Sequence, residues 1–172
     1  MVLKKNLVLV GMMGSGKSTI GKIIANRLKF DFIDLDNEIE KREKILITKI
    51  FELKGEKYFR EVEEDVALSK LEQNSKIISL GGGSFLNEKI RKLVLKNHIS
   101  FWLNWDKDTL IERIIKSGKR PLVKNLSKKD LTKMIIERSR IYAEANFKID
   151  CKKLSKNEIV RNIINIYEIK QN

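Results

Sequence analysis

The chain has 172 residues, 42% of them hydrophobic and 34% charged, and this balance predicts one globular domain, residues 1–172, with a sizeable core. No apolar run approaches the roughly 18 residues that a membrane helix needs, and the first apolar stretch begins at Leu7, which leaves no room for a signal peptide. Because there is one cysteine and one histidine, we expect no disulfide, no zinc cluster and a cytoplasmic location.

The net charge of +13 would suit a nucleic-acid-binding protein, but the distribution of the charge argues against that class. The lysines are scattered, with no block of roughly five or six like charges, and no aromatic residues interleave with them for base stacking. We therefore expect neither a nucleic-acid nor a membrane partner. Lysines outnumber arginines three to one, which suggests that each arginine is used for its flat guanidinium fork.

Residues 11–19, with the sequence GMMGSGKST, fit the phosphate-binding loop pattern GxxxxGK[ST]. A continuous apolar run at residues 7–10 is typical of a parallel strand buried on both faces, and residues 20–28 have apolar side chains at helical spacing. Glycines let backbone N–H groups approach phosphate, and a helix N-terminus favours an anion. A chance glycine-rich turn is the alternative, and the flanking strand and helix argue against it.

The loop therefore predicts an ATP site in which Lys17 reaches the β- and γ-phosphates and Ser18 offers its hydroxyl to Mg²⁺. The predicted nucleotide-binding residues of this loop are Gly14, Ser15, Gly16, Lys17, Ser18 and Thr19.

The next predicted strand, residues 30–33, is followed by two carboxylates, Asp34 and Asp36. Residues two apart in an extended segment point the same way, so we expect both to face one pocket. That pocket would lie at the C-terminal edge of the sheet, where open α/β folds bind ligands. Capping of the following helix is the alternative role for Asp36, since Asn37 and Glu38 come next, and the two roles can coexist.

Residues from about 45 to 72 have the apolar spacing of a helix, with a break at Gly55. Arg60 stands in this stretch among acidic residues. An intrahelical ion pair with Glu64, four residues on, is the plain alternative to a functional role for this arginine.

An apolar strand at residues 76–80 runs directly into Gly81, Gly82 and Gly83. Three consecutive glycines lose much backbone entropy on folding, and a plain turn needs fewer. We therefore expect this backbone to approach a ligand closely, again at the C-terminal end of a strand.

Further elements complete an alternation of strands and helices, which predicts a parallel, doubly wound α/β domain flanked by helices. Helix N-termini are marked by Asp106, by Ser127 with Asp130, and by Ser155 with Glu158. The predicted elements are a helix at 87–95, a strand at 99–103, a helix to 115, a helix at 127–145, a strand at 147–151 and a closing helix.

Residues 116–124 hold four basic residues, a glycine and the only proline of the chain, with little periodicity. This composition predicts an exposed, mobile loop. In a protein with a phosphate-binding loop, a basic loop between two helices suggests a lid, about residues 117–125, that brings cations to the phosphates. A plain solvated loop is the alternative.

The motifs, in this order, resemble those of the shikimate kinases, which have the small nucleoside-monophosphate-kinase-like P-loop fold, and the resemblance covers nearly the whole chain. It rests on residues 11–19, Asp34-Leu35-Asp36, residues 59–63 (FREVE), residues 81–83, Arg120-Pro121-Leu122, and Arg138 with Tyr142. The resemblance implies ATP-dependent phosphorylation of the 3-hydroxyl of shikimate, a step towards chorismate and the aromatic amino acids. It also implies Mg²⁺, ATP as co-substrate, and a monomer.

The resemblance further implies roles for individual residues. Asp34 would help to hold Mg²⁺ through water, Asp36 would contact the substrate hydroxyls, and Arg60 with Arg138 would hold the substrate carboxylate. The triple glycine would line the substrate site, within a region that includes a substrate-binding helical segment at about 36–72. Arg113 would contact adenine and Arg120 the phosphates, whereas residues 150–154 depart from the family pattern at Lys152 and Lys153.

The chemistry agrees with these roles, because arginine forks suit a carboxylate, and phosphoryl transfer needs positioning and neutralisation of charge. We predict that Lys17, Asp36 and Arg120 are catalytic, and leave open whether Asp36 takes a proton or only orients the hydroxyl. Arg140, two residues after Arg138, should point away from it. The alternative functions are another small-molecule P-loop kinase, such as a gluconate kinase, and a basic P-loop module that binds nucleic acid.

Overall fold

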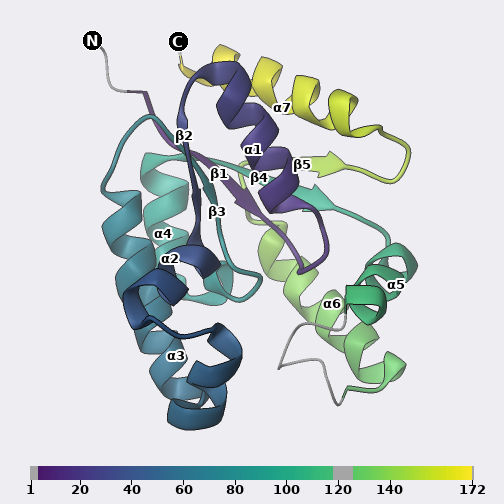
Figure 1. Cartoon of the computed structure of the whole chain (residues 1–172). Helices are drawn as coiled ribbons and strands as arrows, with labels where there is room; N and C mark the ends of the chain where they lie inside the picture. Colours follow the sequence, from purple (N-terminus) through teal and green to yellow (C-terminus); the bar gives the residue numbers. More distant parts are fainter. Residues whose placement is uncertain (1–3, 118–125, 172) are drawn as a thin grey trace.

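The computed structural model describes residues 4–117 and 126–171, which form one parallel sheet covered by helices on both faces (Figure 1). The order of the strands in the sheet is β2-β3-β1-β4-β5, and every neighbouring pair is parallel. The strands are β1 Leu7–Val10, β2 Asp31–Asp34, β3 Lys76–Ser79, β4 Ile99–Asn104 and β5 Phe147–Asp150. The predicted doubly wound α/β fold is therefore confirmed.

The helices begin and end within a few residues of the positions that periodicity predicts. They are α1 Lys17–Leu28, α2 Leu35–Glu43, α3 Ile47–Leu71, α4 Glu88–Asn97, α5 Lys107–Ser117, α6 Lys128–Tyr142 and α7 Lys156–Gln171, with a short 3-10 helix, η1 Ser84–Leu86. No pattern in the sequence predicts η1. The break at Gly55 is confirmed, because its φ of 80° and ψ of 172° interrupt α3.

The N-terminal caps explain where several helices begin. Ser127 and Asp130 form the capping box of α6, and the same exchange of bonds joins Ser155 and Glu158 before α7. Asp106 accepts the backbone N–H of Thr109 before α5. These three predicted caps are confirmed.

The central strand β1 shows how the sheet divides the core. Leu7 and Leu9 pack on one face with residues of α1 and α7, while Val8 and Val10 pack on the other with residues of α2, α3 and α4. Successive side chains of a strand point to opposite faces, so an unbroken apolar run fits a strand that is covered on both sides.

Parallel strands place their C-terminal ends at one edge of the sheet. The loop after β1, the end of β2 and the loop after β3 meet there, which brings residues 11–16, Asp34 and residues 81–83 together. This is the edge at which open α/β sheets bind ligands.

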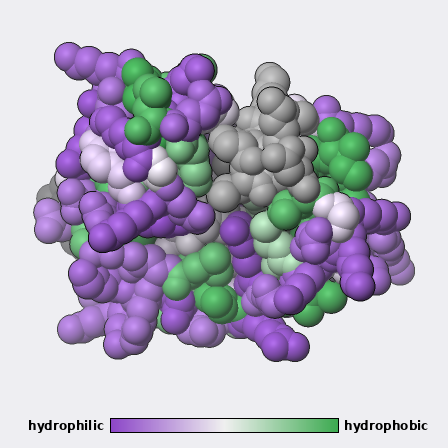
Figure 2. Space-filling model, turned by 90° about the horizontal axis from the view of Figure 1, so that it is seen from below, coloured by the Kyte–Doolittle hydropathy of each residue, from purple (hydrophilic) through white to green (hydrophobic). Residues whose placement is uncertain are grey.

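The surface carries the lysines that the composition predicts. Figure 2 shows one face of the molecule, which is mostly hydrophilic, with apolar residues in several separate patches. The large apolar side chains that are exposed are Leu46, Leu53, Ile115, Ile136 and Ile169. Within residues 4–117 and 126–171, no helix is long and apolar enough to cross a membrane.

Candidate active site

The loop between β1 and α1 has the backbone of a phosphate cradle. Gly14 and Gly16 have φ values of 78° and 88°, in the left-handed region that favours glycine. Lys17 is the first residue of α1, and its Nζ donates to the carbonyl oxygens of Gly11 at 2.8 Å and Met12 at 3.0 Å. The ammonium group is therefore drawn back over the loop, on the side where phosphates would lie.

Ser18 and Asp34 lie next to one another beside this loop. The Ser18 hydroxyl donates a hydrogen bond to Oδ2 of Asp34, which joins the start of α1 to the end of β2. A hydroxyl and a carboxylate are hard oxygen donors of the kind that Mg²⁺ prefers. The two residues that the sequence assigns to the metal are thus adjacent.

Asp34 and Asp36 line the same pocket, as expected, but the reason given from the sequence is wrong. The two residues are not in one extended segment, because α2 begins at Leu35 and Asp36 lies in its first turn. Asp34, not Asp36, precedes the helix, and its side chain makes no capping bond. The turn of the chain from β2 into α2 brings both carboxylates to the pocket, which also contains Lys17 and Gly81.

Polar side chains of the site lie close against the backbone of Gly81 and Gly83. A Cβ at Gly81 would lie 2.8 Å from Oδ1 of Asp36 and 2.8 Å from Oγ of Ser84, and a Cβ at Gly83 would clash with the guanidinium of Arg60. Both distances are too short for real carbon contacts. The close approach predicted for this backbone is therefore made, at these two positions, by the protein's own polar side chains.

Arg60 is fixed at the pocket by acidic residues of its own helix, α3. Its Nη1 pairs with Glu63 at 2.7 Å and its Nη2 with Glu56 at 3.1 Å. The Glu63 side chain is only 4% exposed and also accepts a bond from the Ser84 hydroxyl at 2.7 Å. A buried carboxylate that is bonded on both sides holds the guanidinium in one orientation.

The alternative given for Arg60, an ion pair with Glu64, is not formed among the described side chains. Glu64 pairs instead with Lys89 at 2.7 Å and accepts a bond from Asn87, both at the start of α4. The reason is the direction of each side chain: Glu64 faces α4, while Arg60 turns into the pocket. Helical spacing alone does not determine whether Arg60 pairs with the acidic residue at i+3, at i+4 or at i−4.

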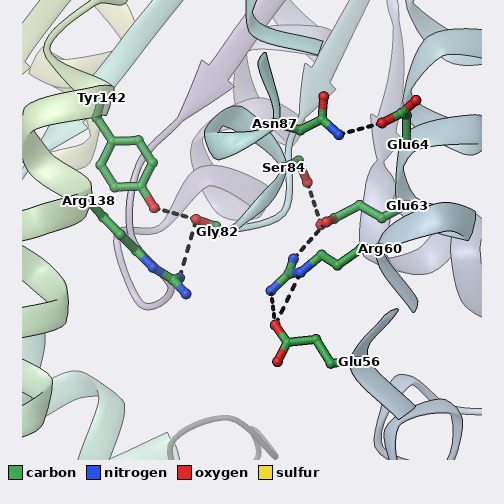
Figure 3. Close-up of polar contacts among 9 residues, drawn as sticks. All are labelled: Glu56, Arg60, Glu63, Glu64, Gly82, Ser84, Asn87, Arg138 and Tyr142. Atoms are coloured by element: carbon green, nitrogen blue, oxygen red, sulfur yellow. Dashed lines mark hydrogen bonds and ion pairs between the residues drawn. The ribbon is translucent and has the colours of Figure 1, made fainter. Parts of the chain in front are cut away.

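Arg138 enters the pocket from the opposite side, on α6. Its Nη1 donates to the carbonyl oxygen of Gly82 at 3.4 Å, and the Tyr142 hydroxyl donates to the same oxygen. Figure 3 shows Arg60 and Arg138 pointing toward one another from α3 and α6. Arg140 is exposed whereas Arg138 is half-buried, as the helical spacing predicts.

A polar and aromatic pocket lies between these two arginines, and we call it the carboxylate pocket. It is lined by Met13, Asp36, Ile47, Phe51, Phe59, Arg60, Glu63, Gly82, Gly83 and Arg138. We call the pocket that contains Lys17, Asp34 and Gly81 the phosphate pocket. The two pockets share Met13, Asp36 and Gly82, so they adjoin. A molecule in the carboxylate pocket would therefore lie next to the phosphate-binding loop.

Arg113 and Trp105 flank the other side of the phosphate-binding loop. The Arg113 guanidinium lies 3.8 Å from the centroid of the Trp105 ring, and its Nη1 donates to the Gly14 carbonyl at 3.3 Å. Trp105 Nε1 donates to the Ser15 carbonyl at 2.9 Å. The sequence pattern places Trp105 among residues that pack at the rim of the core, and this contact with the loop is not predicted from it. Trp105 comes directly after β4, at the edge of the sheet where ligands bind, and this position in the sequence is the feature that indicates a contact with the loop.

The predicted lid lies almost wholly outside the described residues. The structure does not describe residues 118–125, which include Arg120, Pro121 and Leu122. Ser117, predicted as the start of the lid, is the last residue of α5. The structure thus brings together the loop, both aspartates, the triple glycine, Arg60, Arg113 and Arg138.

A phosphate-binding loop on a parallel sheet, next to a pocket with two arginines and a carboxylate, defines a P-loop kinase of the nucleoside-monophosphate-kinase-like fold. The family model described as "Shikimate kinase" matches residues 13–168. This chain belongs to the shikimate kinase family.

Individual relatives support this assignment. The chain is 43% identical to the shikimate kinase of Bartonella quintana, over 94% of this chain and 77% of that protein. Among solved structures it is similar to the shikimate kinase of Acinetobacter baumannii in complex with shikimate, with a TM-score of 0.91, 26% identity, and 98% and 95% of the two chains covered. The shikimate kinase of Aquifex aeolicus gives a TM-score of 0.85 at 33% identity, over 96% and 97% of the chains.

Proposed function

We propose that this protein transfers the γ-phosphoryl group of ATP to the 3-hydroxyl of shikimate, which gives shikimate 3-phosphate and ADP. Family membership supports the reaction over the gluconate kinase and nucleic-acid alternatives. The observation that supports the site is the pair Arg60 and Arg138, which face one another across a pocket that adjoins the phosphate-binding loop.

The nucleotide is assigned to the loop and to Arg113. Backbone N–H groups of residues 14–19 and the ammonium of Lys17 would hold the phosphates. The Ser15 hydroxyl is buried and has no hydrogen-bond partner among the described residues, so it is available to a phosphate oxygen. Arg113 would contact adenine, and Arg120 would add a further cation to the phosphates.

Ser18 and Asp34 would hold Mg²⁺. Their oxygen donors fit the ion, and Mg²⁺ usually takes one or two carboxylates together with substrate phosphates and water. In the part of the chain that is described, no three His, Cys, Asp or Glu residues form a metal cage, which agrees with a site completed by the nucleotide. When bound, the ion would neutralise charge on the phosphates.

Shikimate is assigned to the carboxylate pocket. Arg60 and Arg138 would bind its carboxylate, Gly81 to Gly83 would line its ring, and Asp36 would orient the attacking 3-hydroxyl. Asp36 suits this task because it lines both pockets, and the hydroxyl must reach from one to the other. The reaction then depends on alignment and on the positive charge of Lys17 and Arg120, since a loose transition state needs little help from a base.

We also propose that the enzyme acts as a monomer in the cytoplasm, with neither nucleic acid nor membrane as a partner. The scattered lysines support the lack of a nucleic-acid partner, and the single, buried Cys151 supports the cytoplasm, while the monomer rests on the resemblance to the family.

A coupled assay of ADP release tests the proposal. Shikimate, gluconate and nucleoside monophosphates are compared side by side, with and without Mg²⁺. We expect turnover only with shikimate and Mg²⁺. Equal or faster ADP release with gluconate would contradict the proposed function. Retention of labelled oligonucleotide on a filter at moderate salt would support the nucleic-acid alternative instead.

A further inference from the structure

Tyr142, the last residue of α6, is bonded to the loop that lines the carboxylate pocket. Its hydroxyl donates a hydrogen bond to the carbonyl oxygen of Gly82, 60 residues earlier in the chain. The residue is 1% exposed, and burial raises the pKa of its phenol to about 12. Tyr142 is therefore a neutral hydrogen-bond donor throughout the physiological pH range.

The same Gly82 oxygen accepts a second bond, from Nη1 of Arg138 at 3.4 Å. Arg138 and Tyr142 are four residues apart, so they share one face of α6, and Figure 3 shows both reaching Gly82. The two lone pairs of one carbonyl are thus engaged by one helix. Because a peptide unit is planar and trans, this also fixes the direction of the Gly83 N–H.

The two bonds are unequal. The bond from Arg138, at 3.4 Å, is longer than the 2.7–3.2 Å that is usual for N–H···O bonds and is therefore weak. Tyr142 therefore provides the main link. The Tyr142 hydroxyl also interacts with the Arg138 guanidinium, and the N–H groups of Arg138 that face neither Gly82 nor Tyr142 remain for a ligand. Without the hydroxyl, the carbonyl would depend on Arg138 alone. The cost of an unpaired buried oxygen would then draw the guanidinium onto the loop.

We infer that Tyr142 is a positioning residue for substrate binding: its hydroxyl holds the Gly82 peptide and thereby leaves the Arg138 fork available to the substrate carboxylate. The inference rests on the proposed function, because it takes Arg138 as a ligand of that carboxylate. A hydroxyl with a merely structural role would stabilise the fold and leave the affinity for shikimate unchanged.

Tyr167, in α7, provides a matched control. It is also 1% exposed, burial raises the pKa of its phenol, and its hydroxyl donates to the backbone carbonyl of Lys5. It packs in the core cluster on the face of the sheet that is covered by α1 and α7, opposite the cluster that contains Tyr142. Replacing either tyrosine with phenylalanine removes the same kind of bond and keeps the ring.

The test compares steady-state kinetics and thermal melts of the wild type, Tyr142→Phe and Tyr167→Phe. We expect Tyr142→Phe to raise KM for shikimate about fivefold or more while KM for ATP changes less than about twofold. Both variants should lower Tm by similar amounts, because each loses one buried hydrogen bond. Tyr167→Phe should leave both KM values within about twofold of the wild type.

The outcomes separate this inference from the proposed function. An unchanged KM for shikimate in Tyr142→Phe, an equal rise of both KM values, or the same rise in Tyr167→Phe would overturn the positioning role. A wild-type protein that releases no ADP in response to shikimate would overturn the proposed function, and the role of Tyr142 with it.

Discussion

Arg60 is a cation whose orientation is set by two carboxylates of its own helix. Glu63 is bonded to Nη1, while Glu56 is bonded to Nε and Nη2. Burial by itself lowers the pKa of Arg60, but Glu63 and Glu56 raise it overall, so the guanidinium stays charged. The group points across the pocket toward Arg138 (Figure 3). A fixed, planar fork suits a carboxylate, and lysine cannot reproduce this geometry.

Arg60→Lys and Arg138→Lys should each raise KM for shikimate about tenfold or more, because lysine keeps the charge and loses the fork. KM for ATP should change little, since neither side chain lines the phosphate pocket. Steady-state kinetics with each substrate varied in turn measure both effects.

Glu64→Gln is the control for this pair, because Glu64 pairs with Lys89 and not with Arg60, and it should leave KM for shikimate unchanged. If Arg60→Lys lowers Tm and spares KM, then Arg60 is a structural residue and the carboxylate is bound elsewhere.

Single residues also mark the limit of what the sequence predicts. The three glycines after β3 indicate a close approach, but only the fold shows that Asp36 and Arg60 are the groups that approach Gly81 and Gly83. Likewise, the sequence offers Arg60 several acidic neighbours, and the tertiary contacts of Glu64 with α4 decide against that partner. Side-chain direction depends on packing between elements, which spacing along the chain does not contain.

At the scale of elements, the strands and most helix ends could be predicted. Unbroken apolar runs identify buried parallel strands, and capping boxes identify the starts of α6 and α7. The start of α2 lies slightly earlier than capping by Asp36 would imply, because Asp34 precedes the helix and makes no capping bond. The helix η1 was missed because three residues carry no periodic signal.

Trp105 joins two elements on the nucleotide side of the site. It follows β4, its indole N–H bonds to the Ser15 carbonyl, and its ring packs under the Arg113 guanidinium on α5. The position of α5 against the phosphate-binding loop therefore depends partly on this side chain.

Trp105→Phe should raise KM for ATP about fivefold, because phenylalanine keeps a ring under Arg113 but loses a hydrogen bond worth about 1 kcal/mol. KM for shikimate should stay near the wild-type value, since Trp105 does not line the carboxylate pocket. Steady-state kinetics in which ATP and shikimate are varied separately measure both KM values. A larger effect on shikimate than on ATP would contradict this role for Trp105.

At the scale of the whole molecule, the parallel sheet and the net charge act together. The sheet brings the ends of β1, β2 and β3 to one edge, so residues far apart in the sequence form adjoining pockets. ATP and shikimate are both anions, and a net charge of +13 favours their approach at low ionic strength. The excess of lysine is therefore compatible with a small-molecule kinase and does not require nucleic acid.

His98, the only histidine of the chain, lies between α4 and β4 and links the stability of the whole fold to pH. It is 6% exposed, and both ring nitrogens are buried. Burial lowers the pKa of His98 below its usual 6.5; the Leu71 backbone opposes this shift in part, and the nearby Lys5 adds to it. The folded protein therefore favours the neutral imidazole, while the unfolded chain takes up a proton more readily.

The free energy of unfolding should accordingly be constant above the unfolded pKa of His98, about 6.5, and fall as the pH drops below it. The slope has an upper limit of about 1.4 kcal/mol per pH unit, because the unfolded state binds at most one more proton at this group than the folded state. Carboxylates with lowered pKa values, such as Glu38 and Asp106, act only at more acidic pH. Urea unfolding at several values between about pH 5.5 and 7.5 measures the slope, and His98→Phe, which cannot titrate, should flatten it. The same slope in His98→Phe as in the wild type would show that another group is responsible.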